Sequence, residues 1–326
     1  MKVTHGYQHE IARPYPVVTI GNFDGHHIGH RALLQAVVET ARKVGGTALV
    51  LTFDPHPVRI LAPHVNLRFL TDPEEKLGFF RAAGVEEVVF VEFTRSFAAL
   101  PPEAFVEQVL VQGLHAKELF VGRHFVFGHN RAGKVEDLVV LGARHGVLVH
   151  PMDPVLAGGT IVSSTRIRQL IQAGSVDQAA PLLGRRYTVA GMVSRGAQRG
   201  HEIGWRTANL RLPADRVMPP DGVYATVALW KERRYDSISY IGTRPTFGAG
   251  ERLLEVHLFD EEPDLYGERI VVEFVGRVRG DVRFSGTEAL SRQITLDVES
   301  ARELLRNIQP TQAAQATAAQ ATMEKQ

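Results

Sequence analysis

The sequence contains no cysteine among its 326 residues. This absence excludes a disulfide framework and thiol-based catalysis. Long apolar segments are also missing, because no hydrophobic run approaches the roughly 20 residues that a membrane-spanning helix needs. The first residues, MKVTHGYQHE, lack the apolar core of a signal peptide. We therefore expect a soluble, cytoplasmic protein that does not bind a membrane.

An excess of charge of one sign is missing too. The chain has 37 Lys and Arg against 36 Asp and Glu, a net charge of +1, which argues against a nucleic-acid partner. Hydrophobic residues make up 44% and charged residues 22%, as in ordinary globular proteins. The length favours two domains. A homo-oligomer is compatible with this composition, which does not define the oligomeric state.

Residues 17–34 combine a short apolar strand, a glycine-bearing loop and the start of an amphipathic helix. His27 and His30 share one face of that helix, in the first turn, where unpaired N–H groups attract anions. The spacing alone is more typical of a surface pair, but the preceding strand and the glycines favour a phosphate site at a strand end. A closed zinc site lacks a third ligand, and a Walker A loop lacks its Gly-Lys-Ser/Thr.

The first half alternates strands and helices, which predicts a parallel sheet. The expected strands are residues 17–20, 47–53, 88–93, 119–122 and 146–151, with helices that include 74–83 and 101–114. A later stretch, residues 161–168, places two serines and two arginines at an expected helix start, where they suit triphosphate oxygens. Its alternative is a plain helix cap followed by solvated arginines.

The periodicity changes in the second half. Residues 174–186 carry Gly, Pro and a basic pair and mark the expected domain boundary, and short alternating strands follow. Such strands predict an antiparallel sheet or a small barrel. A helix is expected over residues 287–308. We predict domains at 1–183 and 184–309, and a disordered Ala/Gln/Thr tail at 310–326.

Two groups of residues in the second half suit phosphate chemistry. Gly196, Gly200 and Gly204 allow close backbone contact with phosphates, and Thr207 and Asn209 offer neutral oxygens to a Mg²⁺ ion. On the glycines alone, a turn-rich hairpin of a small barrel is the better explanation. On the segment LLEVHLFD, Glu255 points away from the apolar face and is a candidate general base, with a salt bridge at the barrel rim as the alternative.

These motifs together resemble a known family. GNFDGHHIGH, TFDPHP, LTDPEEKL, FVGRHFVFGHNRAG and SSTRIRQLI are similar, in order, to the adenylyltransferase half of the bacterial bifunctional riboflavin kinase/FAD synthetases. DGVYA, IGTRPTFG, LEVHLFD and DLYG resemble their riboflavin kinase half. The resemblance implies a nucleotidylyltransferase-type, doubly wound parallel sheet, followed by a smaller antiparallel β-barrel with a C-terminal helix.

The resemblance also implies roles for individual residues. Glu255, His27 and His30 would be catalytic, and Thr207 and Asn209 would hold Mg²⁺. The implied flavin-binding residues are Asp54, His56, Phe125 and Arg279. The implied ATP- and phosphate-binding residues are Gly21, Asn22, Phe23, Asp24, Gly25, Gly29, Asn130, Ser163, Ser164, Thr165, Arg166, Arg168, Gly196, Gly200 and Gly204.

The implied function is conversion of riboflavin to FMN and of FMN to FAD, with ATP, riboflavin and FMN as substrates. Arg206 and Tyr240 replace the Pro and Asn usual in the family, so an FMN adenylyltransferase with a weak kinase domain is the main alternative. A class I tRNA synthetase shares the short motif His-Ile-Gly-His but would need a Lys-Met-Ser-Lys-Ser-like loop. A nucleotide-binding regulator is the non-enzymatic alternative.

Overall fold

The computed structural model describes residues 1–8, 12–194, 205–211, 213–243, 252–261 and 263–307. The chain divides into two compact units, Met1–Ser164 and Thr165–Gln326, and each is described by itself. No helix in these described ranges combines the length and apolarity needed to cross a membrane. The division falls earlier than the boundary at 183/184, which stays a prediction.

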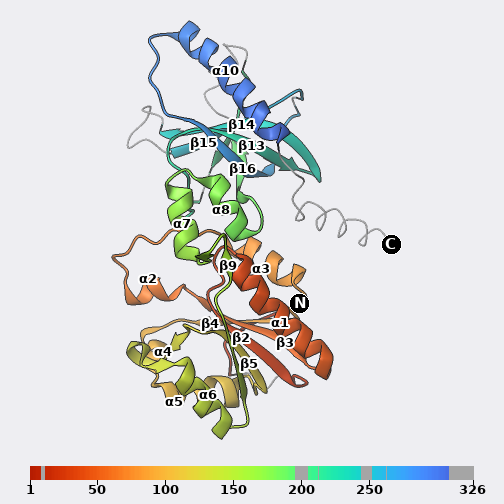
Figure 1. The fold of residues 1–326 in the computed structure, drawn as a ribbon, viewed down its shortest axis with the longest axis vertical. Helices are drawn as coiled ribbons and strands as arrows, with labels where there is room; N and C mark the ends of the chain where they lie inside the picture. Colours follow the sequence, from red (N-terminus) through yellow and green to blue (C-terminus); the bar gives the residue numbers. More distant parts are fainter. Residues whose placement is uncertain (9–11, 195–204, 212, 244–251, 262, 308–326) are drawn as a thin grey trace. The chain divides into compact units, whose positions relative to one another are not determined.

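The first unit is built on a six-stranded sheet in the order β1-β4-β3-β2-β5-β8 (Figure 1), and every neighbouring pair is parallel. Its central strands are nearly continuous apolar runs because helices cover both faces. The strands are β1 (Lys2–His5), β2 (Pro16–Ile20), β3 (Thr47–Asp54), β4 (Glu87–Glu92), β5 (Glu118–Gly122) and β8 (Leu148–Met152). The predicted parallel sheet is confirmed.

Two hydrophobic layers lie on the two faces of this sheet. Helices α1 (Ile28–Val44) and α3 (Pro73–Ala82) pack on one face, and the π-helical segment η1 (Phe105–Gly113) and α6 (Val135–Arg144) pack on the other. Helix α3 begins with Asp72 as its N-cap and a capping box to Glu75, as the Thr-Asp-Pro sequence before it predicts.

Smaller elements complete the first unit. They are α2 (Pro57–Leu61), α4 (Arg95–Ala98), α5 (Pro102–Ala104), β6 (Val126–Phe127), η2 (His129–Arg131), β7 (Gly133–Lys134), β9 (Leu156–Ala157) and β10 (Thr160–Ile161). The helix expected over residues 101–114 is divided into α5 and η1. Gly113 in η1 lets Tyr7 approach, since a Cβ there would lie 2.6 Å from Tyr7 Cδ2.

The second unit contains a closed barrel in the order β11-β12-β15-β14-β13-β16, whose pairs are all antiparallel. This confirms the predicted barrel. Its strands are β11 (Tyr187–Ser194), β12 (Ala208–Arg211), β13 (Gly222–Trp230), β14 (Arg233–Thr243), β15 (Arg252–Leu258) and β16 (Arg269–Gly280). Helix α7 (Ser164–Gln172) leads into this unit, and α8 (Val176–Leu183) occupies most of the segment expected to be a linker.

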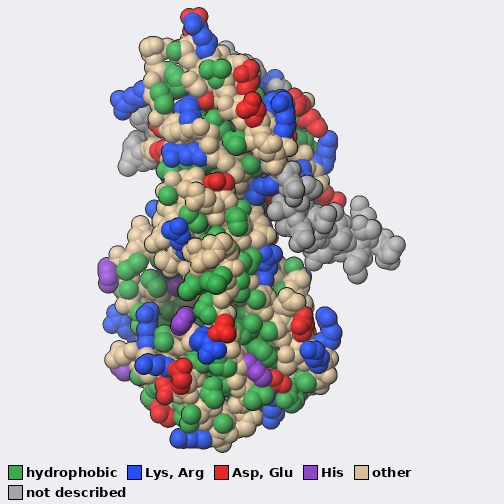
Figure 2. Space-filling model, in the orientation of Figure 1, with side chains coloured by type: hydrophobic (Ala, Val, Ile, Leu, Met, Phe, Trp, Pro, Cys, Tyr) green, Lys and Arg blue, Asp and Glu red, His purple; other side chains and the backbone are tan. Residues whose placement is uncertain are grey.

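The C-terminal helix α10 (Thr287–Arg306) lies across the barrel (Figure 1) and confirms the expected helix. Ala301 and Leu305 on α10 are buried against Val223, Ala225 and Ile238 of the barrel wall. On the face drawn in Figure 2, basic and acidic side chains are interspersed, as the balanced composition indicates.

Candidate active sites

The loop after β2 is held in place by the buried carboxylate of Asp24. This group accepts hydrogen bonds from the backbone N–H of Leu70 (3.0 Å) and of Thr71 (3.1 Å) and from the Thr71 hydroxyl (3.0 Å). Gly25 in turn donates to Thr71 Oγ1 at 3.1 Å, and its φ of +85° suits glycine. By accepting these hydrogen bonds, the Asp24 carboxylate positions the loop, and its phosphate-binding role stays a prediction.

The two predicted catalytic histidines lie together at the start of α1. His27 is the N-cap, and its Nδ1 accepts the backbone N–H of His30 at 3.2 Å. Their rings stack with centroids 3.6 Å apart and an angle of 16° between the planes. The structure therefore brings both imidazoles to the carboxyl end of a central parallel strand, as the sequence predicts.

The electrostatic environment keeps His30 uncharged. Burial lowers the pKa of His30 well below 6.5, and the nearby charges of His27, His26 and Lys76 lower it further. Its Nδ1 is buried and has no hydrogen-bond partner in the described part of the chain. A neutral imidazole can donate a hydrogen bond to a phosphate oxygen but brings no positive charge.

This low pKa makes the stability of the first unit depend on pH. At pH values between 6.5 and the lower pKa that His30 has in the folded protein, the unfolded chain binds a proton at His30 and the folded chain does not. The stability contributed by neutral His30 is thus fully present above pH 6.5 and is lost as the pH falls. We expect the free energy of unfolding to fall more steeply between pH 7 and 5 in the wild type than in His30→Asn, measured by urea unfolding. Equal slopes would contradict this.

Other predicted ligands surround the same loop. The Ser164 hydroxyl, at the start of α7, donates to the backbone carbonyl of Asp24 at 2.8 Å. Asn22 is half-buried, and its Oδ1 has no hydrogen-bond partner in the part of the chain that is described. Gly29 lies close to the His27 ring, since a Cβ there would be 3.2 Å from His27 Nδ1. Phosphate binding by these residues stays a prediction.

The remaining predicted ligands of the first half are distributed more widely. Thr165, Arg166 and Arg168 lie in α7 and belong to the second unit. Asn130, in η2, is exposed, with a φ of 54°. His56 caps α2 through its Nδ1, Asp54 ends β3 with an exposed side chain, and half-buried Phe125 stacks on Phe127. Flavin contacts by Asp54, His56 and Phe125 stay predictions.

In the barrel, three neighbouring strands place Asn209, Glu255 and Tyr240 in one row. Asn209 of β12 is directly opposite Glu255 of β15, which is directly opposite Tyr240 of β14. Directly opposed residues of antiparallel strands point to the same face. The candidate Mg²⁺ ligand and the candidate base are therefore neighbours, although they are far apart in sequence. Thr207 lies immediately before β12, two positions before Asn209.

Tyr240 is the member of this row that we did not predict as a functional residue. Its hydroxyl donates to Asp281 Oδ1 at 3.0 Å. Burial, that hydrogen bond, and the carboxylates of Asp281, Asp221 and Glu255 raise its pKa to about 12. Its ring lies over Gly242, where a Cβ would be 2.2 Å from the Tyr240 hydroxyl oxygen. Tyr240 therefore remains a neutral phenol beside Glu255.

Arg279 forms an ion pair in the barrel unit, and its predicted flavin contact stays a prediction. Its Nε lies 2.9 Å from both carboxylate oxygens of buried Asp297 in α10, and its Nη1 donates to the Gly280 carbonyl. This arrangement anchors α10 to β16. The glycines of the predicted phosphate loop, Gly196, Gly200 and Gly204, lie outside the described residues.

Comparison with known proteins decides between the families that share these motifs. The family model described as FAD synthetase matches residues 10–166, and the one described as riboflavin kinase matches residues 183–305. The bifunctional riboflavin kinase/FMN adenylyltransferase of Escherichia coli (strain K12) is 39% identical over 88% of this chain and 92% of that protein. The chain belongs to this bifunctional family. The Bacillus subtilis (strain 168) member is 32% identical over 90% of the chain and 93% of that protein.

A solved structure supports the fold of this riboflavin kinase/FMN adenylyltransferase family member. The solved structure is described as a macrolide-efflux protein from Streptococcus pneumoniae and is 32% identical in sequence. The match covers 93% of the present chain and 99% of the Streptococcus pneumoniae chain, with a TM-score of 0.83. Membership of the bifunctional family disfavours the tRNA synthetase alternative. A member of this family needs ATP, so nucleotides are its substrates.

In the described residues, no group of three or more His, Asp or Glu side chains gathers that could hold a metal ion. A Mg²⁺ ion held here would therefore depend on neutral oxygens and on the phosphates themselves. Asn209 fits this requirement, because its side chain is buried next to Glu255.

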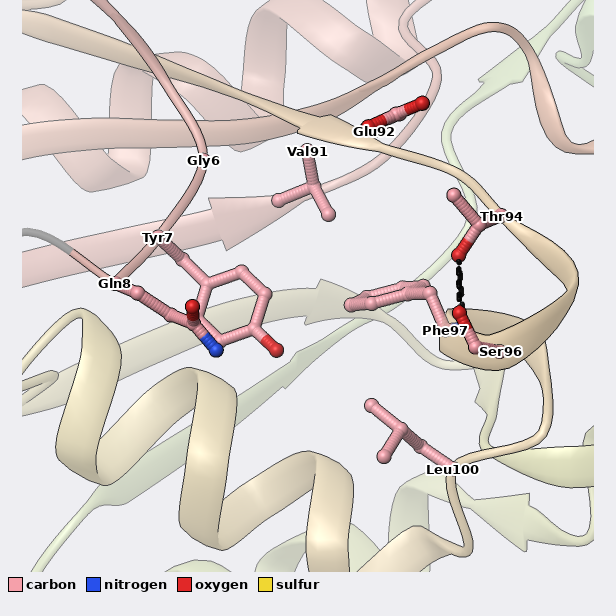
Figure 3. Close-up of a pocket in the computed structure, with 9 residues that line it drawn as sticks. All are labelled: Gly6, Tyr7, Gln8, Val91, Glu92, Thr94, Ser96, Phe97 and Leu100. Atoms are coloured by element: carbon pink, nitrogen blue, oxygen red, sulfur yellow. Dashed lines mark hydrogen bonds between the residues drawn. The ribbon is translucent and has the colours of Figure 1, made fainter.

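A separate pocket opens at the carboxyl ends of β1 and β4, with a volume of about 440 Å³ (Figure 3). Tyr7 and Phe97 point into it from opposite sides, and the hydroxyls of Thr94 and Ser96 are hydrogen-bonded to each other at 2.8 Å. None of the predicted site residues lines this pocket.

Proposed function

We propose that this chain carries out both reactions of its family: it transfers a phosphoryl group from ATP to riboflavin and then an adenylyl group from a second ATP to FMN. One observation carries the proposal. The stacked histidine pair of the first unit and the Asn209–Glu255 pair of the barrel occur in one chain, each in the part matched by the corresponding family model.

In the adenylyl transfer, a phosphate oxygen of FMN attacks the α-phosphorus of ATP. The new P–O bond forms as the bond from the α-phosphorus to the bridging oxygen breaks, and that oxygen leaves with the electron pair on pyrophosphate. The attacking phosphate is already ionised, so no strong base is needed. His27, His30 and the N–H groups at the start of α1 donate hydrogen bonds to the oxygens on which charge develops.

In the phosphoryl transfer, Glu255 accepts the proton of the riboflavin 5′-hydroxyl while that oxygen attacks the γ-phosphorus. The bond from the γ-phosphorus to the bridging oxygen breaks, and ADP leaves. Thr207 and Asn209 would hold Mg²⁺, which when bound neutralises the phosphate oxygens. The half-buried position of Glu255 between Asn209 and Tyr240 supports this role.

The second candidate is an FMN adenylyltransferase with a weak kinase, which Arg206 and Tyr240 favour because they depart from the family pattern. Chromatography of purified protein with riboflavin, ATP and Mg²⁺ separates the two. We expect FAD, with FMN as an intermediate. FAD formed from supplied FMN but not from riboflavin would favour the second candidate, and no flavin product from either substrate would contradict both. A cytoplasmic location, where ATP is available, stays a prediction.

A further inference from the structure

Helix α3 packs one face against the histidine loop. Phe79 stacks on His26 with centroids 4.7 Å apart, and the buried ring of Phe80 meets Phe23 edge-on at 5.3 Å. Lys76 precedes Phe79 and Phe80 by three and four positions, so it shares their face of the helix. The hydrogen bonds from Leu70 and Thr71 to Asp24 fix the segment that leads into α3. Lys76 is therefore directed toward the loop that carries His27 and His30.

The Lys76 side chain is half-buried, and its ammonium forms no hydrogen bond or ion pair within the described ranges of the chain. Its pKa is lowered from 10.5 by burial, whereas the charges of Asp24 and Asp54 raise it. Asp24 already accepts hydrogen bonds from the 70–71 backbone, and Asp54 is exposed at the end of β3. A half-buried ammonium without a hydrogen-bond acceptor is suited to bind an anionic ligand.

His27 and His30 cannot both bring a positive charge to a triphosphate. His27 and His30 stack at 3.6 Å, and two positive rings at that distance would repel each other. The low pKa of His30 keeps that ring neutral near pH 7. Lysine starts from a much higher pKa, so Lys76 brings a positive charge to this loop that does not depend on the histidines.

We propose that Lys76 is a catalytic residue of the adenylyl transfer, whose ammonium binds the β- and γ-phosphoryl oxygens of ATP and neutralises the charge that develops on the leaving pyrophosphate. This inference rests on the proposed function, because it requires ATP to bind at the histidine loop. It adds a positive charge from α3 to the hydrogen bonds that the histidines donate. Lys76 does not itself gain or lose a proton in the reaction.

The test compares Lys76→Met with Lys76→Arg, and with Lys43→Met as a matched control in an exposed position near the end of α1. We expect Lys76→Met to lower kcat/KM for ATP in FAD formation from FMN about tenfold or more, and Lys76→Arg to recover part of it. Inhibition of FAD formation by added pyrophosphate should weaken in Lys76→Met by a similar factor. Riboflavin phosphorylation and the activities of Lys43→Met should stay at the wild-type level.

Two results would overturn the inference. One is a Lys76→Met protein with unchanged kcat/KM for ATP. The other is a loss of activity with unchanged pyrophosphate inhibition and a lower melting temperature, which would assign Lys76 to packing around Asp24 and Asp54. The activity of the wild-type protein separates a failure of this inference from a failure of the proposed function. Wild-type protein that forms no FAD from FMN would contradict the proposed function itself.

Discussion

Replacing His30 by alanine is expected to lower FMN adenylylation about tenfold or more while riboflavin phosphorylation stays close to the wild-type rate. The reason is local: His30 stacks on His27 in the first turn of α1, where hydrogen-bond donors face the phosphates in the proposed mechanism. Initial rates of FAD formation from FMN and of FMN formation from riboflavin measure the two effects separately.

His27 needs a matched pair of variants because its ring also caps α1. His27→Ala removes both the cap and the imidazole, and loss of a cap costs about 1 kcal/mol. His27→Asn keeps a good capping side chain and removes only the imidazole. We expect both to lose adenylylation to a similar extent. If His27→Asn were fully active, the capping function alone would explain the residue, and an equal loss of both activities would indicate misfolding.

The second large effect is expected at Glu255. Glu255→Gln keeps the shape of the side chain but removes the proton acceptor, so riboflavin phosphorylation should fall roughly a hundredfold or more. FAD formation from supplied FMN should not change. Steady-state kinetics with riboflavin and with FMN measure the two activities.

An exposed glutamate on α10, Glu299, provides the control for this variant. Glu299→Gln should keep both activities. Glu255→Gln with a near wild-type kinase rate would show that Glu255 only forms a polar contact at the barrel rim. Such a result would leave riboflavin phosphorylation without a base and would require another acceptor in the barrel.

Local sequence signals predicted much of the fold. Apolar runs of strand length specified β2, β3 and β5, and Thr71, Asp72 and Pro73 specified the start of α3 because capping depends only on neighbouring residues. The close approach of His27 and His30 was predictable for the same reason, because their spacing at the start of one helix places the two rings together. The alternation after residue 187 likewise predicted the barrel strands.

Features that depend on tertiary contacts were missed. Strand β1 is short and lies at the sheet edge, so it has no continuous apolar run. The hydrogen bonds of Asp24 could not be predicted from its own loop, because their donors, Leu70 and Thr71, lie 46 and 47 positions away. The role proposed for Lys76 depends on the packing of α3 against the histidine loop. The position of Tyr240 beside Glu255 depends on the register of β14 and β15, which no local pattern encodes.

The central claim is that one chain performs two transfers from ATP at two separate sites. The most direct test supplies riboflavin with ATP labelled either at the γ- or at the α-phosphorus and locates the label in the FAD formed. We predict that the γ-label enters the FMN half and the α-label the AMP half, and that FMN in place of riboflavin leaves only the α-label. FAD without the γ-label from riboflavin, or no labelled FAD at all, would contradict the account.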